Sequence, residues 1–179
     1  MSITLQTDRL YFRELQPSDD EAMFALDPNP EVHRYLGNKP ITTIEQSRDM
    51  IQNIRQQYQT NGIGRMAAVL KETDEFIGWV GLKLERNVNG RDQFYDIGYR
   101  LLQEHWGNGY ATEANLFFRD YAFNNLKIQV LNATALTAHK ASCRMLEKTG
   151  LVFTEVFDYD GQECRWFEMI NPAMPYEKE

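Results

Sequence analysis

Two glycines ahead of a predicted helix could present bare backbone amides to an anion. They are Gly107 and Gly109, in a segment 106–114 that reads WGNGYATEA and follows a predicted strand. The first amides of a helix have no intrahelical partner, and the helix dipole adds about half a positive charge at that end. Because glycine has no Cβ, an anion can approach such a backbone closely. The segment therefore predicts an anion site of the kind that binds phosphates.

Other phosphate-binding motifs fit this segment less well. A P-loop requires GxxxxGK[ST], and no Lys-Ser or Lys-Thr follows these glycines. A dinucleotide fingerprint requires a third glycine where Thr112 stands, and an acid at a strand end about 20 residues further on, which is missing. The remaining alternative is a loop that only turns the chain into the helix.

The elements that must position this segment alternate between strands and helices. Predicted strands cover residues 9–15, 66–70, 76–84, 94–101 and 128–133, and two last strands meet at Asp160-Gly161. One predicted helix begins at Pro17 and is ended by Pro28 and Pro30, and a second begins at Thr43 and is ended by Asn61-Gly62. Two more cover about 109–124 and 141–148. Short connections, such as the loop 87–90, predict an antiparallel meander. The chain is therefore expected to form an α/β domain with a mixed, mostly antiparallel sheet.

Length and composition limit the classes of function. The 179 residues fit one domain, over 1–179. A net charge of −7 argues against a nucleic-acid partner and favours amines, polyamines or basic peptides. No apolar stretch approaches the ~18 residues of a membrane span, and we expect no signal peptide, since residues 1–9 lack a basic patch followed by an apolar run. Cys143 and Cys164 form no CxxC pair and lie near no His cluster, so we expect free thiols in the cytoplasm and no metal.

The segment 106–114 resembles the pyrophosphate loop of the GNAT superfamily of acetyltransferases, and most closely that of its ribosomal-protein N-acetyltransferase (RimJ/RimL-like) branch. That loop reads Gln/Arg-x-x-Gly-x-Gly/Ala. Gly109 and Ala111 match it, and Trp106 stands at the first position, as in many members of the branch. The resemblance covers nearly the whole chain, through residues 7–13, 30–37, 77–82, 96–101 and 142–151. It departs at His139, where Asn is usual, and at Leu151, where Phe is usual.

This resemblance implies a fold and a cosubstrate. The fold would be a GNAT-like sheet flanked by helices, with the fourth and fifth strands, here 94–101 and 128–133, splayed apart. The cosubstrate would be acetyl-CoA, with its pantetheine arm in the splay and its diphosphate on the glycine loop. The residues implied to bind it are Tyr99, Arg100, Leu101, Leu102, Trp106, Gly107, Asn108, Gly109, Tyr110, Ala111, Thr112, His139 and Ser142.

The resemblance also implies catalytic roles. Asp96 matches the acid that relatives use as a general base, directly or through water; the alternative is a solvated strand residue. Ser142 matches the donor of a proton to departing CoA; the alternative is a helix N-cap. His139 is expected to replace a structural contact rather than to act as a base. No His-acid pair brackets Cys143, and direct transfer needs no acyl-enzyme.

The implied activity is transfer of the acetyl group to a primary amine, first of all the N-terminal amine of a protein. Polyamines and aminoglycosides are alternative acceptors, and a non-catalytic acyl-CoA-binding module is the alternative of another class. Expected acceptor walls are 31–37, 43–58 and the last hairpin, whose Tyr159 and Trp166 could line the acceptor cleft or the face of a homodimer. The aromatic residues Phe117, Phe118, Tyr121 and Phe123 are expected in the core.

Overall fold

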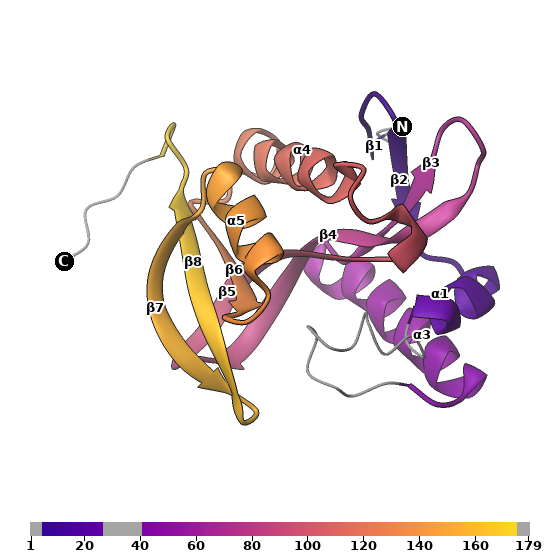
Figure 1. The fold of residues 1–179 in the computed structure, drawn as a ribbon, viewed down its shortest axis with the longest axis horizontal. Coiled ribbons are helices and arrows are strands. Elements are labelled where there is room, and N and C mark those ends of the chain that lie inside the picture. The colour runs from indigo at the N-terminus through magenta and orange to yellow at the C-terminus, as the bar shows by residue number, and fades with distance from the viewer. Residues whose placement is uncertain (1–4, 27–40, 175–179) are drawn as a thin grey trace.

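The computed structural model describes residues 5–26 and 41–174, which form one continuous sheet with helices on both faces (Figure 1). Its strand order is β1-β2-β3-β4-β5-β6-β8-β7. The strands are β1 (Leu5–Gln6), β2 (Leu10–Glu14), β3 (Met66–Leu70), β4 (Phe76–Val88), β5 (Arg91–Leu101), β6 (Val130–Leu136), β7 (Val152–Tyr159) and β8 (Gln162–Ile170). The helices are η1 (Pro17–Asp19), α1 (Asp20–Leu26), α3 (Ile44–Asn61), η2 (Gln103–His105), α4 (Tyr110–Asn124) and α5 (Lys140–Lys148).

The expected splay lies between β5 and β6. These two strands are parallel, because α4 crosses over between them, and they pair only at Tyr95 with Leu131 and at Asp96 with Asn132. Beyond that point β5 continues to Leu101 while still paired with β4, and β6 continues while paired with β8. The inner edges of both strands are thereby left apart. Every other strand pair is antiparallel, so the predicted mixed, mostly antiparallel sheet is confirmed.

The core has two parts, one on each face of the sheet. Alternation along β3 sends Ala68 into a cluster with α4 and α5, and sends Ala67 and Val69 into a cluster with α1 and α3. Figure 1 shows α4 on one side of the sheet and the α1–α3 pair on the other. The α4 aromatics pack as expected, since the ring of Phe118 lies 4.8 Å from that of Phe12. Among the described residues, no helix is long and apolar enough to cross a membrane.

Local sequence signals specify several element ends. Thr43 caps α3 in a capping box with Gln46, and Gly62 ends that helix at a φ of 72°. The β7–β8 hairpin turns at Asp160 and Gly161, both with positive φ. The predicted helix end at Pro28 and Pro30 and the predicted acceptor wall 31–37 lie outside the described residues.

The predicted loop 87–90 is wrong in length. In the structure, β4 and β5 run to Val88 and from Arg91, so only Asn89 and Gly90 form the turn. Both have positive φ, at 49° and 71°, which is the backbone of a two-residue hairpin turn. An Asn-Gly pair in this tight turn lets the flanking strands pair further than their apolar residues indicated. The short strand β1 was not predicted at all.

A test of the fold concerns Gly78, beside the irregularity in the β3–β4 register. Its φ is +149°, and a Cβ there would overlap the backbone oxygen of Arg100 on β5. We expect Gly78→Ala to lower the free energy of unfolding in urea by about 3 kcal/mol or more, since it combines backbone strain with overpacking. Gly90→Ala, where φ is +71° and nothing lies within 4 Å, is the matched control and should cost roughly 1–2 kcal/mol. Equal costs would contradict this packing.

Candidate functional site

A cavity of about 470 Å³ opens where β5 and β6 part. Its walls come from β5, the loop before α4, the first turn of α4, the end of β6 and the start of α5. The sequence-predicted residues that line it are Asp96, Tyr99, Arg100, Leu101, Trp106, Gly107, Gly109, Tyr110, Ala111, Thr112, His139 and Ser142. Two others do not line it: Leu102 packs against the α1–α3 cluster, and Asn108 turns its side chain onto its own loop.

The first turn of α4 faces this cavity with uncapped amides. Gly109 is the N-cap, at a φ of 82°, and no side chain caps the helix. The first helical hydrogen bond is donated by the amide of Glu113 to the Gly109 carbonyl, at 3.0 Å. The amides of residues 110–112 precede that bond and so have no helical acceptor. Gly107, at a φ of 77°, bends the preceding backbone into the concave shape that favours anions.

The glycine loop is held from outside the cavity by Arg9 and Glu113. The Arg9 guanidinium donates to the Asn108 carbonyl at 2.8 Å and to a Glu113 carboxylate oxygen at 2.7 Å. The other oxygen of Glu113 accepts from the Thr7 hydroxyl at 2.6 Å and from the Arg9 amide at 3.0 Å. The guanidinium also lies 4.4 Å from the centre of the Tyr110 ring. These contacts fix the loop without occupying the amides of the first turn.

Tryptophan at position 106 ties the same loop to the end of β5. The Trp106 indole donates to the Leu101 carbonyl at 2.9 Å. The Asn108 side-chain amide donates to the carbonyls of His105 and Trp106 at 3.2 and 3.3 Å. The glycine loop is therefore anchored at both ends, which keeps the α4 amides in place before any anion arrives.

Asp96 lies at the fork where the two strands separate, and its side chain is buried against Arg65. Nη2 of Arg65 pairs with the carboxylate, while Nη1 donates to the backbone oxygens of Gly81 and Asp96. Burial raises the pKa of Asp96, and the charge and hydrogen bond of Arg65 oppose that rise. The alternative that Asp96 is a solvated strand residue is wrong, since only 8% of it is exposed.

Ser142 is the third residue of α5 and faces Tyr99 of β5. Burial raises the pKa of Tyr99, and a hydrogen bond with the Ser142 side chain lowers it. The N-cap of α5 is His139, so the alternative that Ser142 caps this helix is wrong. His139 is half-buried on the cavity wall, and this burial lowers its pKa, which favours the neutral imidazole.

Of the remaining candidate residues, the two cysteines and Trp166 are buried, and Tyr159 borders the cavity. Cys143 and Cys164 are both buried free thiols, and burial raises the pKa of each, so neither is poised as a thiolate nucleophile. Trp166 is fully buried against Phe94 and is a core residue. Tyr159 is half-exposed and lines the cavity, so of the two hairpin aromatics it alone borders the site.

Sequence reasoning missed two arginines of this region. Arg65 follows α3 and meets Asp96 from 31 positions away, and Arg9 meets Glu113 across 104 positions. Neither contact leaves a periodic signal. No signal in the sequence could have found the Arg65 pair, because the burial that requires Arg65 to have a partner is seen only in the structure.

Comparisons with known proteins identify the family and the fold. The family model described as "Acetyltransferase (GNAT) domain" matches residues 9–152. The uncharacterized N-acetyltransferase p20 of Bacillus licheniformis is 34% identical, over 83% of this chain and 85% of its own length. The uncharacterized N-acetyltransferase YoaA of Bacillus subtilis is 36% identical, over 82% of this chain and 81% of its own length. The structure of RimL, a ribosomal L7/L12 alpha-N-protein acetyltransferase in complex with coenzyme A, superposes with a TM-score of 0.80 at 15% identity, covering 96% of this chain and 99% of that one.

The Glu113 contacts predict a pH-dependent stability. Burial acts to raise the pKa of Glu113, but hydrogen bonds from Thr7 and Arg9 outweigh it and hold the pKa below its usual value. A lowered folded-state pKa contributes stability that is complete above the unfolded pKa of about 4.3 and is lost as the pH falls through the folded one. We expect Glu113→Gln to lower the free energy of unfolding by about 1–2 kcal/mol at pH 7, and the difference from wild type to shrink below about pH 4.

The measurement is urea unfolding of both proteins between pH 3 and pH 7. Glu72→Gln removes the same charge from an exposed turn and should leave the free energy of unfolding unchanged. A gap for Glu113→Gln that is the same at pH 3 and pH 7 would show that the carboxylate charge is not what holds the loop.

Proposed function

Since this chain belongs to the GNAT acetyltransferase family, we propose that it transfers the acetyl group of acetyl-CoA to the N-terminal amine of a protein. The observation that carries the proposal is the uncapped first turn of α4, which faces a cavity in the β5–β6 splay. Free main-chain donors at a helix N-terminus suit a diphosphate, and the cavity beside them suits a narrow arm that ends in a thioester.

The described residues fit coenzyme A as follows. The diphosphate would accept hydrogen bonds from the amides of residues 109–112, with Gly107 giving it a close approach. The pantetheine arm would lie along β5 at 99–101, where the strand edge facing β6 is unpaired and can form main-chain hydrogen bonds. Trp106, His139 and Ser142 would complete the walls. Leu102 and Asn108 would support the loop rather than touch the cofactor.

Asp96 is our proposed general base, acting directly or through a water molecule. An alkyl ammonium group has a pKa near 10, so the acceptor amine must lose a proton before it attacks the acetyl carbon. Asp96 stands at the inner end of the splay, on the same cavity as the proposed thioester site. Arg65 holds this carboxylate in one orientation, and burial raises its affinity for a proton.

Ser142 is our proposed proton donor to the departing thiolate. Its side chain is buried on the cavity wall and hydrogen-bonded to Tyr99, so a proton could be replaced through the Tyr99 hydroxyl. A thiolate whose conjugate acid has a pKa near 8.5 leaves without much help, so this role assists turnover rather than enabling it.

The size of the cavity bears on the acceptor. A volume of about 470 Å³ holds one small ligand, and the pantetheine arm takes much of it. A protein N-terminus needs to insert only its first residue, and Tyr159 and Gln162 of the last hairpin line the cavity that would receive it. Polyamines are equally slender and remain the second candidate, whereas an aminoglycoside would have to bind largely outside.

A screen of N-terminal peptides, polyamines and aminoglycosides with labelled acetyl-CoA decides among them. Tight CoA binding without turnover on any of them would instead indicate a non-catalytic acyl-CoA-binding module.

The diphosphate assignment is tested by removing a single amide. Proline is tolerated at the first position of a helix, so Tyr110→Pro deletes one N–H donor while keeping a helical φ at residue 110. Tyr110→Ala is the matched control, because it removes the ring over Arg9 but keeps the amide. By calorimetry we expect Tyr110→Pro to bind CoA about tenfold or more weakly than Tyr110→Ala, the loss of one hydrogen bond to a charged group. Equal affinities would place the diphosphate elsewhere.

The base assignment is tested with Asp96→Asn. We expect kcat to fall about 10²-fold or more, with the affinity for CoA unchanged. Because this change also leaves Arg65 unpaired, the free energy of unfolding should fall by roughly 3–5 kcal/mol. The double variant Arg65→Met, Asp96→Asn removes both charges and should recover stability without recovering turnover. If turnover returns with stability, Asp96 is a structural residue and the proposed base role is wrong.

A further inference from the structure

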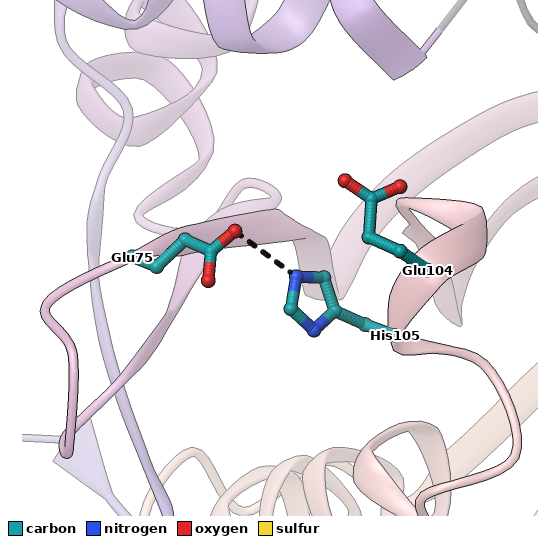
Figure 2. A group of neighbouring side chains, drawn as sticks. All are labelled: Glu75, Glu104 and His105. Atoms are coloured by element: carbon teal, nitrogen blue, oxygen red, sulfur yellow. Dashed lines mark hydrogen bonds and ion pairs between the residues drawn. The ribbon is translucent and has the colours of Figure 1, made fainter.

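A second group of potential ligands lies beside the glycine loop, around His105, which also borders the cavity described above. It consists of His105 and Glu104 in η2 and of Glu75 just before β4 (Figure 2). One ligand atom from each residue lies within 4.8 Å of the others. We propose that these three side chains bind a divalent cation of the zinc class.

The spacing of the first two ligands already fits such an ion. His105 Nε2 and a carboxylate oxygen of Glu75 are 3.2 Å apart, and Figure 2 shows them facing one another. Two ligands each about 2.1 Å from a tetrahedral zinc ion are separated by about 3.4 Å. An ion can therefore fit between these two atoms if their separation changes by a few tenths of an ångström.

The third ligand lacks a positive partner. Within residues 5–26 and 41–174, no Lys or Arg forms an ion pair with Glu104, although its carboxylate lies within 4.8 Å of the Glu75 carboxylate. Two neighbouring carboxylates repel each other, and a bound dication reverses that repulsion. Both Glu side chains are exposed, so they can close the remaining distance at little cost.

The chemistry of the donors selects the ion. One imidazole nitrogen and two carboxylate oxygens suit Zn²⁺, whereas Mg²⁺ prefers oxygen ligands alone in octahedral geometry. The His105 side chain is only 13% exposed and its ring packs 6.3 Å from that of Tyr110, which fixes the orientation of the nitrogen donor. Three protein ligands leave at least one position for water.

The sequence shows no sign of this arrangement, because Glu75 and His105 are 30 positions apart. The pairing of β4 with β5 brings them together, since Glu75 precedes the start of β4 and η2 follows the end of β5. The expectation of no metal considered only Cys and His spacing along the chain, and so could not include this cluster.

The test is a calorimetric titration of the metal-free protein with Zn²⁺, using a reductant that does not bind metal. We expect one ion per chain in the wild type and in Glu72→Gln, an exposed acid outside the cluster. Affinity should fall at least about tenfold in Glu104→Gln and in His105→Ala, and Mg²⁺ should not compete. No uptake by the wild type, or unchanged uptake by His105→Ala, would overturn the proposal. If His105→Ala fails to fold, Glu104→Gln decides, because that side chain is exposed.

A second readout locates the ion. Added Co²⁺ should broaden the imidazole NMR signals of His105 before those of His139, which lies on the cavity wall near α5. Broadening that begins at His139 and spares His105 would place the ion elsewhere and contradict the proposed ligands.

Discussion

Unpaired backbone amides at the start of α4 are the feature on which the proposed activity depends. A helix beginning normally has its first amides capped by a side chain, and here Gly109 offers none. The cost of leaving these donors without a protein acceptor is tolerated because the turn faces an open cavity. The parting of β5 and β6 creates that cavity, so the sheet topology and the helix end are two parts of one arrangement.

The loop must be rigid without filling its own binding site, and the contacts of Arg9 meet both needs. Its guanidinium holds the Asn108 carbonyl and the Glu113 carboxylate from the outer side, while Trp106 ties the loop to β5. The inner side, with its amide hydrogens, is left for the anion. Pre-organisation of this kind lowers the conformational cost of binding. A similar division holds at Asp96, where Arg65 orients a carboxylate that also faces the cavity.

The sequence predicts those parts of the fold whose causes are local. The capping box at Thr43, the turn at Asp160-Gly161 and the glycine loop each specify their structure within a few residues. The long-range pairs could not be predicted this way. The contacts Arg9–Glu113, Arg65–Asp96 and Glu75–His105 each join a loop residue to a distant helix or strand, and only the packing of the whole fold brings them together. The burial of Asp96 also follows from its place at the fork, which no local pattern reveals.

The central claim is that the amides of residues 109–112 bind the diphosphate of coenzyme A. The most direct measurement is a titration of the 15N-labelled protein with CoA, followed by amide proton chemical shifts. We expect the amide protons of 109–112 to move downfield together at one affinity, and the amides of Asn89 and Gly90 in the β4–β5 turn, which do not line the cavity, to stay in place. If the 109–112 signals stay in place while CoA binds, the diphosphate lies elsewhere on the protein.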